Sequence, residues 1–108
     1  MNDANLRVEI IRFVDEYPQP GIVLCNFRDA TDKVHEITDK VPIFTVEPLW
    51  HDSTYPQTGT ARCEVLKRFE DIDGRHKALI TIERPDHLES TTGLTKFLVL
   101  ESSLWKSD

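Results

Sequence analysis

The stretch Thr60–Glu83, which reads T-A-R-C-E-V-L-K-R-F-E-D-I-D-G-R-H-K-A-L-I-T-I-E, decides the fold class of this chain. Apolar and polar residues alternate over Thr60–Arg68, and Ile and Leu recur over Arg75–Glu83, which is typical of β-strands. Between them the run Glu70–Gly74 ends in Asp-Gly, a dipeptide that favours the positive φ angles of a hairpin turn. The segment therefore predicts an antiparallel hairpin.

Short strand-like segments separated by turn residues continue on both sides of this hairpin. We predict further strands at Arg7–Val14, Ile22–Phe27, Val34–Thr38 and Thr95–Glu101, the third continuing to Phe44 past an irregularity near Pro42. No window shows the helical period of about 3.6 residues, so one turn of helix within Pro48–Ser53 is the most we expect. The pattern predicts a small all-β barrel or sandwich of six to seven mostly antiparallel strands.

The composition indicates one globular domain spanning residues 1–108. Of these residues 39% are hydrophobic and 30% charged, and 13 Lys and Arg stand against 19 Asp and Glu, giving a net charge of -6. No apolar run approaches the ~20 residues that cross a bilayer, and no signal peptide is evident, so we expect a cytoplasmic protein that binds no membrane. The negative charge argues against nucleic-acid binding and favours a basic protein partner.

Two parts of the chain echo one another. The residues Tyr17–Gly21 (Y-P-Q-P-G) recur 38 positions later as Tyr55–Gly59 (Y-P-Q-T-G), and Cys25 recurs at the same offset as Cys63. We interpret residues 7–50 and 55–105 as two copies of one β motif that pack about a pseudo-two-fold axis. The alternative is that Y-P-Q-x-G is an entry from a loop into a strand that the chain uses twice.

Several longer stretches resemble a known group of proteins. These stretches are Pro20–Ala30, Asp39–Phe44, Ser53–Val65 and Leu88–Val99. They are similar to a group of small bacterial proteins with the pattern F-V-D, P-G-x-V-x-C, E-K-V-P, Y-P-x-P-G and E-S-T-x-G. The chain departs from this pattern at Asp39, where the group has Glu, and at Thr58, where it has Pro. The group has no assigned activity, so the resemblance implies a compact bacterial domain and transfers no catalytic residue.

Residues that often carry chemistry are present, but their spacing is unspecific. Cys25 and Cys63 alternate with apolar neighbours, which predicts reduced, buried thiols. The four histidines lack the spacing of a zinc site, and neither a nucleophile elbow nor a glycine-rich phosphate loop occurs. We predict a non-catalytic protein without a metal or cofactor. Two alternatives stay open: a small enzyme that uses His35 or His76 with a carboxylate or cysteine at a barrel mouth, and a metal set of both cysteines with both histidines.

The predicted binding residues are acidic and aromatic. Acidic side chains gather in the turns, and an aromatic pair lies on the longest loop, a composition typical of binding hot spots. The predicted set is Asp29, Asp32, Glu70, Asp71, Asp73, Trp50, His51 and Tyr55. The hypothesis is an inhibitor or immunity protein that masks a basic toxin, such as a nuclease, through an acidic face. The alternatives are solvated turns, a Trp50 that only caps the barrel, and self-association through a sheet edge.

Overall fold

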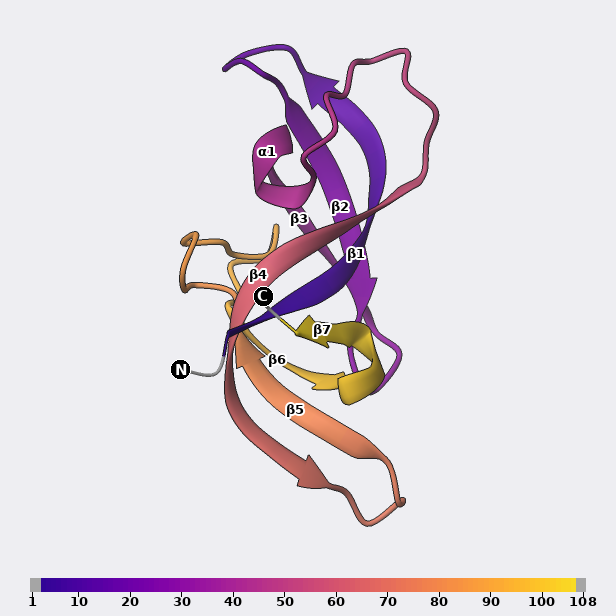
Figure 1. The fold of residues 1–108 in the computed structure, drawn as a ribbon, viewed down its shortest axis with the longest axis vertical. Coiled ribbons are helices and arrows are strands. Elements are labelled where there is room, and N and C mark those ends of the chain that lie inside the picture. Colours follow the sequence, from indigo (N-terminus) through magenta and orange to yellow (C-terminus); the bar gives the residue numbers. More distant parts are fainter. Residues whose placement is uncertain (1–2, 107–108) are drawn as a thin grey trace.

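In the computed structural model, which describes residues 3–106, seven strands form one antiparallel sheet that curls into a half-barrel (Figure 1). The strands are β1 Asp3–Asp15, β2 Ile22–Arg28, β3 Val34–Lys40, β4 Gln57–Glu70, β5 His76–Thr81, β6 Lys96–Leu100 and β7 Leu104–Lys106. Two short helical segments interrupt them, α1 Val41–Phe44 and η1 Glu101–Ser103. The order in the sheet is β3-β2-β1-β4-β5-β6, with β7 on β1. The all-β fold is confirmed.

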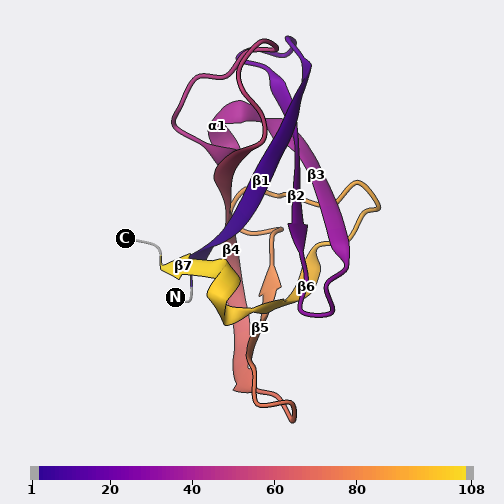
Figure 2. The same cartoon turned by 90° about the vertical axis from the view of Figure 1, so that its right-hand side faces the viewer.

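Two long strands determine the shape of the molecule. β1 pairs with β4 over Asp3–Ile10, and its second half, Glu9–Asp15, pairs with β2. β4 in turn uses Glu64–Glu70 to pair with β5. Each long strand is therefore shared between two partners that are offset along it, and the molecule measures 44 × 26 × 26 Å. The β1–β2 turn and the α1–β4 loop lie at one end of the long axis, and the β4–β5 turn lies at the other (Figures 1 and 2).

The core fills the inside of the curled sheet with alternate residues of its strands. On β1, for example, Leu6, Val8 and Ile10 are at most 1% exposed, while their neighbours on the strand face outward. This alternation is what a sheet with one buried face requires. Each such side chain stabilises the fold by about 1.5–3 kcal/mol relative to an exposed one.

The open side of the half-barrel is closed without a strand ladder. β3 and β6 are the two ends of the sheet path. Ala30 N–H donates to the Leu98 carbonyl at 2.8 Å, and Thr91 N–H donates to the Glu36 carbonyl at 2.8 Å. The ring of His35 lies between Phe27 and Phe97, with centroids 5.4 and 4.7 Å away. These contacts form a seam that holds β3 and its turn against β6.

The central hairpin is confirmed, and one detail of the prediction, the length of the third strand, is wrong. The β4–β5 turn is closed by Asp71 N–H on the Arg75 carbonyl at 2.9 Å, with Gly74 at φ 80°. The third strand does not continue to Phe44, because Pro42 has no N–H for a ladder and the chain turns into α1 there. Residues 48–53, where at most one helical turn was expected, contain no helix: 48–50 are irregular and 51–53 form a turn and a bend.

The predicted repeat stays a prediction, and the two echoed segments lead into strands at different places in the sheet. Residues 7–50 and 55–105 each hold a three-stranded meander, and β1 pairs with β4 between them. Tyr17–Gly21 leads into β2, the second strand of the sheet order, and Tyr55–Gly59 leads into β4, the fourth. The two echoed glycines also differ: Gly21 has φ 120°, while a Cβ on Gly59 would lie 2.8 Å from the Phe44 carbonyl oxygen.

The tight approach at Gly59 predicts a stability effect. We expect Gly59→Ala to lower the free energy of unfolding by about 1–3 kcal/mol, because the added methyl group must displace α1 or Ile10. Urea unfolding measures this, with Thr58→Ala as a control on an exposed position of the same strand. Equal unfolding midpoints for the two variants would contradict the packing of α1 on β4.

Candidate functional site

One end of the molecule concentrates proline and aromatic residues. We call it the proline-rich end and define it as residues 13–21 and 41–57. It holds five of the six prolines, Pro18, Pro20, Pro42, Pro48 and Pro56. The β1–β2 turn, α1 and the α1–β4 loop come together there in both views (Figures 1 and 2). Since proline has no N–H and restricts φ, this end presents an irregular surface instead of a strand edge.

Two adjoining hollows cover the proline-rich end. A hollow of about 450 Å³ runs past α1 and Val46 to Trp50, and its lining is mostly apolar. A second hollow, of about 320 Å³, lies toward Phe13 and Glu16. Pro20 and Trp50 line both, so they form the ridge between the hollows. Val46 is 99% exposed and Trp50 58% exposed, so apolar groups available to a partner are gathered here.

The backbone around Trp50 is fixed by its own loop. Leu49 is buried in the core next to it. Trp50 N–H donates to Ser53 Oγ at 3.0 Å, and the Tyr55 hydroxyl donates to the Trp50 carbonyl at 2.5 Å. Burial raises the pKa of the Tyr55 phenol despite the Ser53 hydrogen bond, and the charge of Asp52 raises it further, so the phenol keeps its proton for this bond. The Trp50 side chain is therefore exposed on a loop whose backbone is held in place by hydrogen bonds.

The proline-rich end is also acidic. Its two segments contain Asp15, Glu16, Glu47 and Asp52, and no Lys or Arg. Asp15 accepts a hydrogen bond from the Tyr17 N–H at 3.1 Å. Within residues 3–106, none of these four carboxylates lies within 4.0 Å of a cationic nitrogen. Their charges are consequently available to an incoming cation.

Two of the predicted acidic residues have an internal partner at the opposite end. Lys77 Nζ lies 2.6 Å from Asp71 Oδ2 and 3.1 Å from Asp73 Oδ2. The Lys77 hydrogen bond lowers the pKa of Asp71, and the Arg75 N–H together with Lys77 lowers that of Asp73. Both carboxylates hold the β4–β5 turn in shape. The third predicted residue of this group, Glu70, is exposed at the end of β4.

The predicted pair Asp29 and Asp32 belongs to the β2–β3 turn. Asp29 Oδ2 lies 2.7 Å from His35 Nε2, and its Oδ1 accepts from the Thr31 hydroxyl at 2.6 Å and the Lys33 N–H at 3.1 Å. Burial alone would raise the pKa of Asp29, but these hydrogen bonds outweigh it and bring the pKa well below its usual range. Asp32 is exposed, at φ 70°, and lies 3.5 Å from Arg28.

The structure thus divides the eight predicted residues among three places. It brings together Trp50, His51 and Tyr55, and it leaves the five carboxylates in two turns outside the proline-rich end. Sequence reasoning missed Glu47, Pro20 and Val46 as members of a surface. The signal that was available is the density of proline and the absence of Lys and Arg in the two segments that meet there.

The two cysteines are buried, and His35 is paired within the fold. Burial raises the pKa of the Cys25 thiol to about 12, and burial is also the main cause that raises that of Cys63 to about 11, so both stay protonated. His35 is paired with Asp29, and neither residue lines the two hollows of the proline-rich end. Within residues 3–106 no three side chains of His, Cys, Asp or Glu are placed to hold a metal ion.

Comparisons with known proteins add no relative. Neither the family models, nor the curated proteins, nor the solved structures with which the chain was compared gave a match. Among the described residues, no helix is long and apolar enough to span a membrane.

The Asp29–His35 contact predicts an acid-dependent stability. A carboxyl whose pKa is lowered by folding stabilises the protein above its unfolded pKa of about 4 and loses that contribution as pH falls. We expect Asp29→Asn to lower the free energy of unfolding at neutral pH by about 1.5–3 kcal/mol. The free energy of unfolding of this variant should also decrease less between neutral and acidic pH than that of the wild type. Urea unfolding at neutral and acidic pH measures both. The exposed Asp32→Asn is the control, and equal behaviour of the two variants would contradict the structural role of Asp29.

Proposed function

We propose that this chain is a non-catalytic binding protein whose proline-rich end docks a basic, partly apolar segment of another protein. One observation carries the proposal. An exposed tryptophan on an ordered loop stands between two hollows, which Glu16 and Glu47 line, and the four carboxylates of this end have no cationic partner within the described residues.

Each part of this surface has a role in recognition. Trp50 offers a large apolar face that also attracts a Lys or Arg side chain through its ring. The hollow along α1 offers space for an apolar side chain of the partner. The ordered Trp50–Tyr55 loop reduces the entropy lost when the complex forms. Carboxylates around the hollows accelerate the approach of a basic partner and select against acidic ones.

The charge distribution supports an oriented approach. The opposite end, residues 67–77, contains four basic side chains, Lys67, Arg68, Arg75 and Lys77, against the three acidic Glu70, Asp71 and Asp73. The proline-rich end has four acidic side chains and no Lys or Arg. A basic partner is therefore steered to the proline-rich end. In its most concrete form, the proposal describes an inhibitor or immunity protein that masks a basic protein such as a nuclease.

The enzyme alternative has less support. It would require the His35–Asp29 pair to reach a substrate, and the His35 side chain is only 7% exposed, at the seam between aromatic rings. His76 lines a shallow hollow with Arg75 and Glu101, and neither cysteine is among the residues that line it.

The proposal predicts the composition of peptides that bind. A random-peptide display library selected on the wild-type protein should yield peptides that combine Lys or Arg with an aromatic or aliphatic residue. We expect Trp50→Ala, and separately the combined Glu16→Gln and Glu47→Gln change, to weaken binding of a selected peptide at least about tenfold, measured by calorimetry. Binding should also weaken as salt is added.

The controls remove similar groups elsewhere. Trp105→Ala removes the second tryptophan, and the combined Glu70→Gln and Glu89→Gln change removes two exposed charges outside the proline-rich end. These variants should bind like the wild type. Selection of acidic peptides, or equal losses in the control variants, would overturn the proposal.

A further inference from the structure

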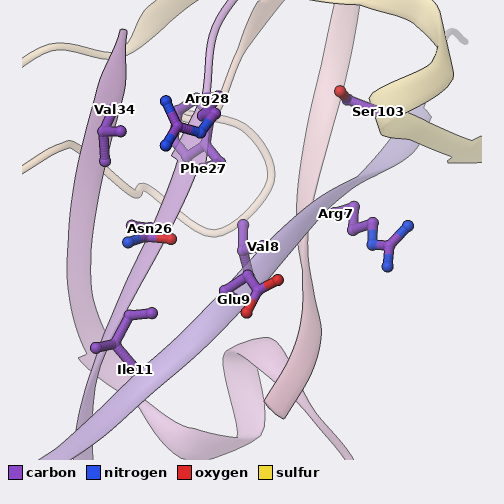
Figure 3. A pocket seen from close by; sticks show the side chains of 9 residues that line it. All are labelled: Arg7, Val8, Glu9, Ile11, Asn26, Phe27, Arg28, Val34 and Ser103. Atoms are coloured by element: carbon purple, nitrogen blue, oxygen red, sulfur yellow. The ribbon is translucent and has the colours of Figure 1, made fainter. Parts of the chain in front are cut away.

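A separate hollow lies beside β1, where the sheet has a gap. On one edge of β1, β7 pairs with Ala4–Leu6 and β2 pairs from Glu9 onward. Arg7 and Val8 have no strand paired with them on that edge, because the pairing of β2 with β1 ends at Asn26 and Glu9. The gap opens into a hollow of about 430 Å³ (Figure 3). This volume lies in the range of sites for small molecules.

The gap places two arginines around the same hollow. If β1 and β2 continued in the register of Glu9 with Asn26, Arg7 would stand directly opposite Arg28. Like charges in that position destabilise a strand pair. The strands separate there instead, and both side chains line the hollow, Arg28 from β2 and Arg7 from the far side of β1 (Figure 3).

Neither arginine is neutralised strongly by the chain itself. Arg28 lies 3.5 Å from Asp32, and the two side chains are 63% and 82% exposed, so their pairing contributes little. Arg7 lies over the Trp105 ring, 5.7 Å from its centroid, and it has no ion pair within residues 3–106. Glu9 is the carboxylate in the lining, and it has no ion pair within residues 3–106. The lining therefore carries an excess of one positive charge.

We propose that this hollow binds a small organic anion, a carboxylate or a phosphate monoester on an apolar body. The Arg28 guanidinium can pair with two oxygens of such a group, and Arg7 adds a second cation at the other side of the hollow, where Figure 3 shows its guanidinium turned away from Arg28. Asn26 and Ser103 add an amide and a hydroxyl donor at the rim. Ile11 and Val34 provide apolar walls for the body of the ligand. The hollow shares no residue with the proline-rich end, so this proposal stands apart from the proposed function.

Titration of the ¹⁵N-labelled protein tests the proposal, with phenyl phosphate, benzoate and inorganic phosphate as probes. We expect saturable shifts of the Arg7 and Arg28 side-chain N–H signals and of the Asn26 side-chain amide. Phenyl phosphate or benzoate should bind more tightly than inorganic phosphate, and the stronger of the two identifies the anionic group. Arg28→Gln and Arg7→Gln should each weaken binding about tenfold.

Arg12→Gln is the matched control, because Arg12 is an exposed arginine of β1 that does not line the hollow. It should bind like the wild type. Shifts that do not saturate, an equal loss in Arg12→Gln, or inorganic phosphate binding as tightly as both organic probes would overturn the proposal. Backbone spectra of all three variants confirm that each one is folded.

Discussion

The antiparallel ladder between β1 and β4 is the constraint on which the rest of the structure depends. Eight residue pairs, from Asp3 with Glu64 to Ile10 with Gln57, join the two long strands. Each strand runs on beyond this ladder to pair with a different hairpin, which makes the molecule long and places its two turn regions at opposite ends. Gly59 lies within the ladder and admits α1, so the same strand pair also positions the loop that carries Trp50.

The net charge of -6 takes on a different meaning once the partners of each carboxylate are known. Asp29, Asp71 and Asp73 are used inside the fold, where His35 and Lys77 contact them. Such pairs organise turns and offer little to a partner. Among residues 3–106 the carboxylates of the proline-rich end have no such ion pairs, and Glu16 and Glu47 line the hollows beside the exposed Trp50. This local combination of charge and apolar surface, not the total charge, supports the proposed function.

Much of the fold was predictable because the sheet has one buried face. Alternation along Thr60–Arg68 and the Asp-Gly turn located the central hairpin, and prolines and glycines separated the other strands. Pro42 was correctly seen as an irregularity, but α1 depends on Val41 and Phe44 reaching the core together, which is a tertiary effect. The echo of Y-P-Q-x-G predicted equivalent strands, whereas the structure uses its two glycines for different reasons.

The candidate site was less predictable, because it depends on which residues meet across the fold. The aromatic loop at Trp50 was found from its composition. A turn carboxylate that pairs with Lys77 has the same local sequence as one that faces solvent, so the sequence alone does not separate the two kinds. Only the fold shows that the β1–β2 turn lies at the same end of the molecule as the α1–β4 loop, which carries Trp50.

Mapping of amide chemical shifts during titration with a short basic peptide tests the central claim most directly. The peptide should contain arginines flanking one aromatic residue. We predict perturbations confined to residues 13–21 and 41–57, with the largest at Trp50 and its neighbours. Perturbations centred on the turn at residues 70–77, or no saturable perturbation at any residue, would contradict the account.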